Sequence, residues 1–326
     1  MASDEKHWLG FDLGGTKMMA KVFDAGFKAT GSHKTKTKGA EGAKEVLGRI
    51  VETVRKALDD AHLKASDLGG IGVGCPGPLD LDRGVILEAP NLGWKNVTLK
   101  ETLEKEFDCP AVIANDVDAG TYGEYRFGAA QKARAALGVF PGTGIGGAFI
   151  YEGRILRGRT SSCLEIGHVQ VQPEGRVCGC GQRGCLETVA SRLAISAEAA
   201  AAAYRGEAPH LLELAGTDLG SIKSGVLAKA IQAGDAVVER IVRNAAQHLG
   251  GAIAGAVNLL APDVVVLGGG LVEAMPDLIL GEVRRTVDAR AMKTFSKGLK
   301  IVVAQLGDDA TVLGAAALAE EVKSKV

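Results

Sequence analysis

Residues 9–22 read LGFDLGGTKMMAKV, and this stretch decides the fold. Leu9, Phe11 and Leu13 alternate with Gly10 and Asp12, and a second alternation of apolar residues follows the Gly-Gly-Thr break. Alternation over short runs predicts two β-strands, and the glycine pair predicts a tight turn between them. We therefore expect a β-hairpin near the start of an α/β protein.

The predicted turn carries chemistry as well as shape, because it holds Asp12, Gly14, Gly15, Thr16 and Lys17. Glycines between two strands let backbone N–H groups face an anion, and a nearby carboxylate suits a hydrated Mg²⁺. The segment is not a P-loop, since it lacks the Gly-Lys-Ser/Thr ending and the helix that would follow. It predicts a phosphate site, with an ordinary hairpin turn as the alternative.

Glycines gather at two later turns. Residues 142–147, which include Thr143 and Gly144, lie between strands expected at 136–140 and 148–151. Gly269 and Gly270 belong to a glycine run after the apolar strand expected at 263–267. Each turn would let a phosphate or a flat ligand approach the backbone, and each is an ordinary turn in the alternative interpretation.

Apolar spacing organises the rest of the chain as helices and strands. Helical spacing covers residues 46–58, 99–107, 191–204, 237–257 and 311–326, and short buried strands are expected at 71–74 and 111–114. Lys34, Lys36 and Lys38 continue a strand pattern with one cationic face. This face predicts a solvated edge whose charges deter strand pairing, with a ligand patch as the alternative.

The strand expected at 111–114 delivers Asn115 and Asp116 to its carboxyl end. Ligands of open α/β sheets bind at that edge. An ionised carboxylate there costs free energy unless it is solvated or partnered, so Asp116 is a candidate general base. The alternative is that Asp116 caps the next helix.

Composition limits the functional classes. The 326 residues suggest two domains, and 46% hydrophobic with 24% charged residues exclude a mainly disordered chain. The 38 basic residues against 39 acidic ones give no charge excess for nucleic acid. Residues 1–6 show no secretory signal, and Asn258, Pro262 and Asp263 interrupt the most apolar region, so we expect a cytoplasmic protein without membrane segments.

Three of the six cysteines cluster, at Cys178, Cys180 and Cys185, after His168. Three thiolates and one imidazole complete a tetrahedral zinc shell with no open position, so the zinc is expected to be structural and not hydrolytic. Glu165 and Glu187 flank these residues, and carboxylates held by the metal would accept hydrogen bonds from sugar hydroxyls. The alternative is that both only orient zinc ligands or face solvent.

These segments, in this order, resemble the ROK family of sugar kinases and repressors, within the hexokinase and actin-like superfamily. The resemblance runs nearly end to end, and its most specific part is CGCGQRGCLE at 178–187. It implies a two-domain actin-like (ribonuclease H-like) ATPase fold with an interdomain cleft and a structural zinc site. It implies a smaller α/β domain at 1–118, completed by the C-terminal helix at 311–326, and a larger α/β domain at 119–310.

The resemblance also implies ATP with Mg²⁺ as donor, dimers or tetramers, and Asp116 as the base for the 6-hydroxyl of a hexose. The implied sugar contacts are Asn91, Asn115, Asp116, Glu165, His168 and Glu187, and His168 also binds zinc. The implied contacts to phosphates and Mg²⁺ are Asp12, Gly14, Gly15, Thr16, Lys17, Thr143 and Gly144. Gly269 and Gly270 would approach the adenosine.

Glucokinase is the leading functional hypothesis. The alternatives are an N-acetylglucosamine or N-acetylmannosamine kinase, a fructose or allose kinase, or a non-catalytic sugar-sensing regulator. The regulator is disfavoured because the first strand starts near Trp8 and leaves no room for a DNA-binding domain before it. Relatives often differ at Cys163, Leu164 and Ala148, and have a proline between Leu92 and Gly93. A bulky Leu164 would exclude an N-acetyl group and favour glucose.

Overall fold

A computed structural model of the chain describes residues 6–89, 92–159 and 164–323. It divides into two compact units. Unit 1 comprises Met1–Gln131, Gly153–Cys163 and Leu306–Val326, and unit 2 comprises Lys132–Glu152 and Leu164–Gln305. The domain limits expected from the sequence stay a prediction. Within the described ranges, no helix combines the length and the apolar character that crossing a bilayer requires.

Unit 1 is built on a five-stranded sheet in the order β3-β2-β1-β4-β8. Its strands are β1 (His7–Leu13), β2 (Lys17–Phe23), β3 (Ala29–Lys36), β4 (Leu68–Cys75) and β8 (Ala111–Asn115). The predicted hairpin is confirmed, because β1 and β2 are antiparallel and Leu13 faces Met18. The β3 strand lies at the sheet edge, as its lysines predicted, although Lys38 follows its end.

One face of this sheet carries the main hydrophobic core of unit 1. Leu9, Phe11 and Leu13 pack there against α1 (Ala43–Asp60) and α2 (Leu99–Phe107). The apolar spacing predicted both helices, and the limits of α2 agree with the prediction. The single turns η1 (Gly39–Glu41) and η2 (Ala65–Asp67) precede and follow α1.

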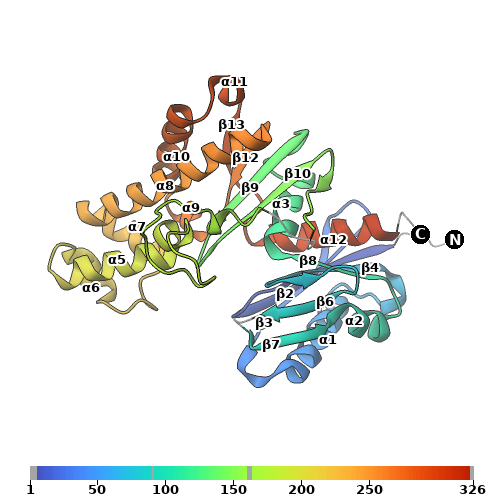
Figure 1. The fold of residues 1–326 in the computed structure, drawn as a ribbon. Helices are drawn as coiled ribbons and strands as arrows, with labels where there is room; N and C mark the ends of the chain where they lie inside the picture. The colour runs from blue at the N-terminus through green and yellow to red at the C-terminus, as the bar shows by residue number, and fades with distance from the viewer. Residues whose placement is uncertain (1–5, 90–91, 160–163, 324–326) are drawn as a thin grey trace. The chain divides into compact units, whose positions relative to one another are not determined.

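The opposite face is covered by α12 (Ala310–Lys323), which also packs against α3 (Asp116–Phe127) (Figure 1). A Cβ added to Gly10 would lie 1.8 Å from the Val312 carbonyl oxygen, and one added to Gly314 would lie 1.8 Å from that of Ala119. These distances are far below ordinary van der Waals contact. Only glycine therefore lets the helix backbone lie directly on the strand and on α3.

A small second sheet in unit 1 was not predicted. It consists of β5 (Leu79–Asp80), β6 (Val85–Ala89) and β7 (Trp94–Thr98), in that order. The strands are too short to show a clear alternation, and Glu88 faces Lys95 across the sheet on exposed positions. Asn91 lies outside the described residues, between β6 and β7.

Unit 2 has a sheet in which β10, β9, β12 and β13 are successive neighbours. These strands are β9 (Ala135–Pro141), β10 (Ile145–Tyr151), β12 (Val264–Leu267) and β13 (Lys300–Val303), and the two-residue β11 (Arg154–Ile155) follows β10 in the chain. The strands expected at 136–140 and 263–267 are confirmed. The turn expected up to residue 147 is shorter, because Gly146 and Gly147 pair as strand residues with Phe140 and Val139.

Helices account for most of the remaining chain in unit 2. They are α4 (Glu187–Ala190), α5 (Arg192–Tyr204), α6 (Pro209–Ala215), α7 (Ser224–Ala233), α8 (Ala236–Leu260), α9 (Gly270–Ala274), α10 (Pro276–Arg290) and α11 (Lys293–Ser296). The predicted helices at 191–204 and 237–257 correspond to α5 and α8. Ser191 caps α5 by accepting a hydrogen bond from the Ala194 N–H at 3.2 Å. The helix therefore begins at Arg192, one residue later than predicted.

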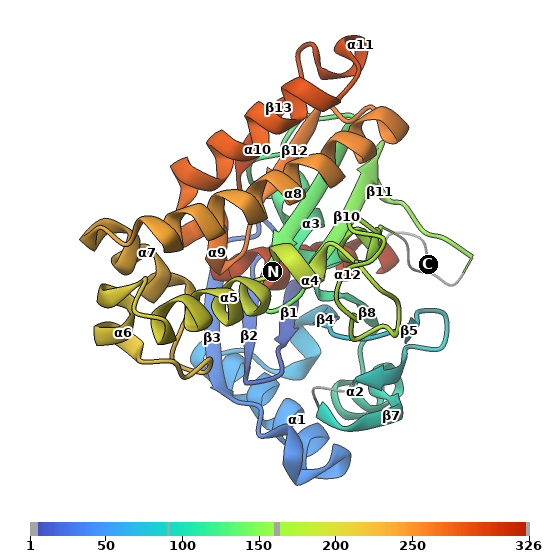
Figure 2. The same cartoon turned by 60° about the vertical axis from the view of Figure 1, so that its left-hand side comes forward.

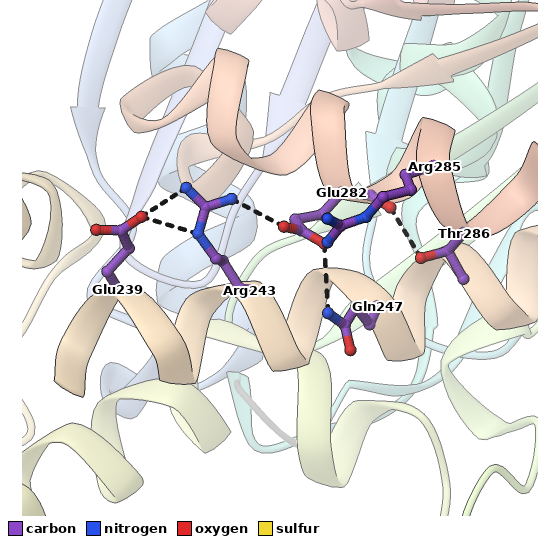
Figure 3. A network of polar contacts seen from close by, with 6 residues as sticks. All are labelled: Glu239, Arg243, Gln247, Glu282, Arg285 and Thr286. Carbon is purple, nitrogen blue, oxygen red and sulfur yellow. Dashed lines mark hydrogen bonds and ion pairs between the residues drawn. The ribbon is translucent and has the colours of Figure 1, made fainter. Parts of the chain in front are cut away.

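The helices α8 and α10 run alongside each other (Figure 2). Glu282, only 3% exposed, joins them: it accepts hydrogen bonds from Arg243 at 2.8 Å and Gln247 at 3.4 Å, and pairs with Arg285 (Figure 3). A buried carboxylate is tolerated when it is paired in this way. The network therefore stabilises the contact between the two helices.

We expect Gly314→Ala to destabilise the protein by at least about 2 kcal/mol, because the new methyl group would force α12 away from α3. The matched control is Gly48→Ala in α1, where an added Cβ meets nothing within 4 Å. That control should raise stability by about 0.5–1 kcal/mol. Urea unfolding would measure both, and equal effects of the two substitutions would contradict the packing argument.

Candidate functional site

Two acidic side chains share the carboxyl edge of the parallel strands in unit 1. Asp12 lies near the end of β1 and Asp116 begins α3, directly after β8. Burial, and after it the negative charge of Asp116, raise the pKa of Asp12 from 3.8 to about 7, against the opposing charge of Lys17. The structure therefore brings together the predicted magnesium ligand and the predicted base.

Thr37, a fully buried residue, forms hydrogen bonds with the backbone of the hairpin turn beside Asp12. Its hydroxyl donates to the Gly14 carbonyl at 2.6 Å, and its N–H donates to the Thr16 carbonyl at 2.9 Å. Gly14 has no room for a side chain, since a Cβ would lie 2.7 Å from the Lys17 carbonyl oxygen. Thr37 was missed because it lies in no motif and reaches the turn only through the β2–β3 pairing.

Asn115 caps α3. Its Oδ1 accepts hydrogen bonds from the N–H groups of Val117 at 2.9 Å and Asp118 at 3.3 Å. The helix-capping role considered for Asp116 thus falls mainly to its neighbour, although Asp116 Oδ1 also accepts from Val117 at 2.9 Å. The cap engages the amide oxygen of Asn115, so its Nδ2 is the group suited to a ligand oxygen.

In unit 2 the glycine turn between β9 and β10 is fixed by two charged residues. Glu187 Oε2 accepts a hydrogen bond from the Ile145 N–H at 3.0 Å, and a Cβ on Gly144 would lie 2.4 Å from that oxygen. Arg192 donates from its backbone N–H to the Gly142 carbonyl at 2.8 Å, and from Nη2 to the Thr143 hydroxyl at 2.9 Å. Glu187 was predicted to contact sugar, whereas Arg192 carried no sequence signal.

The predicted zinc ligands come together. One ligand atom from each of His168, Cys178, Cys180 and Cys185 lies within 4.8 Å of the others. The Cys178 Sγ–His168 Nδ1 distance is 3.5 Å and the Cys180 Sγ–Cys185 Sγ distance is 3.7 Å. Sulfurs bound to one tetrahedral zinc are about 3.8 Å apart, given Zn–S bonds of about 2.3 Å. All three cysteines are free thiols, so the donor set fits zinc.

The segment before the cysteine cluster lies on β10. Glu165 and His168 are both exposed: Glu165 directly precedes the single turn η4 (Ile166–His168), and His168 is its last residue. A Cβ on Gly167 would lie 2.2 Å from the Ile145 carbonyl oxygen, so this glycine permits the close contact. Leu164 packs against the hydrophobic core of unit 2, and its exclusion of an N-acetyl group stays a prediction. Cys163 lies outside the described residues.

Gly269 and Gly270 turn the chain from β12 into α9, and Gly269 has a φ of 86°, a conformation that favours glycine. A Cβ on Gly270 would lie 3.9 Å from Ser224 Oγ. Ser224 and Arg192 line the same hollow of about 480 Å³, together with Leu193, Leu219, Gly220, Lys223 and Gly225. Arg192 also holds the Thr143 turn, so this hollow adjoins both glycine turns of unit 2.

The predicted residues thus form two groups. Asp12, the hairpin turn, Asn115 and Asp116 belong to unit 1, whereas Glu165, the zinc ligands, Glu187 and the later glycine turns belong to unit 2. That the two groups meet at one sugar stays a prediction.

Comparisons with known protein families, sequences and structures all point to one family. Residues 8–322 match the ROK family. The chain is 35% identical over 316 residues to a glucokinase of Halalkalibacterium halodurans, covering 95% of this chain and 94% of that protein. A ROK family glucokinase from Streptomyces griseus, solved with glucose and AMPPNP, has a TM-score of 0.81 and 32% identity, covering 97% of this chain and 99% of that one.

A ROK family transcriptional regulator, a homologue of the E. coli MLC protein, has a TM-score of 0.84 at 25% identity. The match covers 97% of this chain and 78% of the regulator. Family membership rests on the match of residues 8–322 to the ROK family and on the nearly full-length agreement with the two glucokinases. The chain belongs to the ROK family, and within it to the sugar kinases.

Proposed function

We propose that the protein is an ATP-dependent hexose kinase that phosphorylates the 6-hydroxyl of glucose. One observation carries this proposal: Asp116 begins a helix at the carboxyl edge of the sheet, beside Asp12 and the glycine hairpin. A base, a cation ligand and a phosphate turn at one edge are the parts that phosphoryl transfer needs. The glucokinases among the relatives support glucose as acceptor.

Asp116 would act as the base. Its carboxylate takes the proton of the 6-hydroxyl, the sugar oxygen bonds to the γ-phosphorus, and the bond from that phosphorus to the β-phosphate bridging oxygen breaks to release ADP. The Asn115 cap and the α12 contact fix the first turn of α3, and a fixed base spares the reaction the cost of orienting it.

The donor would be held by the glycine turns. Gly14, Gly15, Thr16 and Lys17 face its phosphates, Thr143 and Gly144 contact them from unit 2, and Gly269 and Gly270 approach the adenosine. Leu193 and Leu219, both exposed, give the adjoining hollow an apolar surface suited to the adenine ring of the donor. Asp12 would hold Mg²⁺, which neutralises phosphate charge when it is bound.

Zinc would be structural in this enzyme, since His168 and the three cysteines fill four positions. Glu187 follows Cys185 by two residues, and its Oε1 lies 3.9 Å from Cys178 Sγ. The filled cluster would therefore hold Glu187, Glu165 and His168 in place for sugar hydroxyls. We also propose a cytoplasmic homo-oligomer without nucleic-acid partners, as the sequence predicted.

The acceptor is tested by ADP release with glucose, N-acetylglucosamine, N-acetylmannosamine, fructose and allose. We expect the highest kcat/KM with glucose. A higher value with another sugar would reassign the substrate and keep the kinase. Sugar binding by calorimetry without ADP release from any sugar would favour a non-catalytic sugar-sensing regulator, and one of the related structures is that of a ROK family transcriptional regulator.

Asp116→Asn should lower kcat by roughly 100-fold or more, because the base is lost while the side chain keeps its size. Glucose affinity and the thermal unfolding midpoint should stay close to those of the wild type, which calorimetry and a melting curve would measure. A variant with near-normal kcat would rule out Asp116 as the base.

Asp12→Asn should stabilise the protein more at pH 8 than at pH 5 when Mg²⁺ and nucleotide are absent. The fold raises the pKa of Asp12 from 3.8 to about 7, so the folded state favours the protonated carboxyl and wild-type stability falls as pH rises through that interval. The gain in melting temperature at pH 8 should exceed that at pH 5 by about 2–4 °C. Equal gains in melting temperature at pH 5 and pH 8 would contradict a raised pKa of Asp12 in the folded protein.

Cys180→Ala should remove the zinc and raise the KM for glucose by roughly 10- to 100-fold, because Glu187 and Glu165 lose their anchor. Metal analysis would give the zinc content per chain. Cys109→Ala is the control, since Cys109 is a buried thiol of unit 1 outside the cluster. One zinc per chain and an unchanged KM in Cys180→Ala would show that the cluster does not support the sugar site.

A further inference from the structure

A lysine of the edge strand lies beside the hairpin turn. The β2–β3 register places Lys36 opposite Lys17 and Lys34 opposite Met19, so Lys17, Lys34 and Lys36 share one face of the sheet. This is the face that α12 covers, because Met19 packs against Val312 of that helix. The cationic face noted in the sequence is therefore continuous with the predicted phosphate turn.

One carboxylate binds two of these lysines. Asp308 Oδ2 lies 3.1 Å from Lys17 Nζ and 3.1 Å from Lys34 Nζ, and its turn, η5 (Gly307–Asp309), leads into α12. Both lysines also lie close enough to Asp12 to lower its pKa, against the larger effects of burial and Asp116. Lys34, Lys17 and Asp12 thus belong to one electrostatic cluster.

We propose that Lys34 is a second phosphate-binding lysine beside Lys17, and that Asp308 holds both lysines until the phosphates of the donor replace it. The inference rests on the proposed kinase function. It assigns Lys34 a contact with the donor and Asp308 the role of an internal competitor.

The exchange is physically inexpensive. The side chains of Lys17, Lys34 and Asp308 are 53%, 47% and 66% exposed, and ion pairs this exposed contribute little to stability. A phosphate chain offers several charged oxygens in place of the two of one carboxylate, so it can engage both ammonium groups and still bind the turn. Without an anion, the directly opposed Lys17 and Lys36 would only repel each other.

The competing explanation is that these contacts are ordinary ion pairs of an exposed edge. The chain provides a matched example: Lys21 lies on the same face of β2 and pairs with Asp309, the neighbour of Asp308, at 2.6 Å. Lys21→Ala therefore removes an ion pair of the same type, although a less exposed one, at a position four residues beyond Lys17 on β2. It serves as the control for Lys34→Ala.

The experiment compares wild type, Lys34→Ala, Lys21→Ala and Asp308→Asn by the KM for MgATP, the KM for glucose and the calorimetric affinity for magnesium tripolyphosphate. Tripolyphosphate is a probe without a nucleoside, so it isolates phosphate contacts. Lys34→Ala should raise the KM for MgATP about 5- to 10-fold and weaken tripolyphosphate binding similarly, with the KM for glucose unchanged. Lys21→Ala should match the wild type, and Asp308→Asn should lower the KM for MgATP.

Two results would overturn the inference. Lys34→Ala and Lys21→Ala with equal MgATP and tripolyphosphate affinities would make Lys34 a structural partner, and a higher KM for MgATP in Asp308→Asn would make Asp308 a support rather than a competitor. Either result in an active wild type leaves the kinase proposal intact. A wild type without turnover on any hexose would refute the kinase proposal, while tripolyphosphate binding would still decide the role of Lys34.

Discussion

The candidate site of unit 1 depends on direct backbone contact between α12 and the sheet. Gly10 and Gly72 in the strands, and Gly314 in the helix, each face a carbonyl oxygen that an added Cβ would approach to 1.8 Å. Interiors this dense transmit small displacements instead of absorbing them. Asp12 lies two residues after Gly10 on β1, and Asp116 begins the helix on which α12 packs. These glycine contacts therefore influence how far apart the two carboxylates lie.

The parts of the fold that could be predicted from the sequence are those that depend on local patterns. The hairpin, α2 and the strand before Asp116 follow from apolar periodicity and glycine breaks, which are local properties. The support of the Gly14 turn by Thr37, and that of the Thr143 turn by Arg192, depends on residues distant in sequence that meet only after the sheets form. No spacing rule contains that information, so these positioning residues were missed although the residues they position were found.

Unit 2 uses one carboxylate to connect two kinds of site. Glu187 accepts from the Ile145 N–H with one oxygen, and its other oxygen lies 3.9 Å from a cysteine of the metal cluster. Once zinc is bound, the Cys178 thiolate cannot donate a hydrogen bond to that second oxygen, so the zinc would position Glu187 through the backbone that links it to Cys185, two residues earlier. A zinc bound by all four ligands would therefore serve the proposed kinase by fixing a carboxylate beside a glycine turn.

The charge distribution of unit 1 is what links its structure to its chemistry. Burying Asp12 beside Asp116 raises the pKa of Asp12 to about 7, so this carboxyl group loses its proton less readily in the ligand-free fold than an exposed aspartate does. Such an arrangement is unfavourable for stability alone and becomes favourable when a cation arrives, because each negative charge then has a partner. In the proposed kinase, a divalent ion accompanied by the phosphates of the donor would supply that cation, and those phosphates would bind the lysines that Asp308 holds. The carboxylates and the lysines of this edge would then each be matched by one part of the metal–phosphate complex.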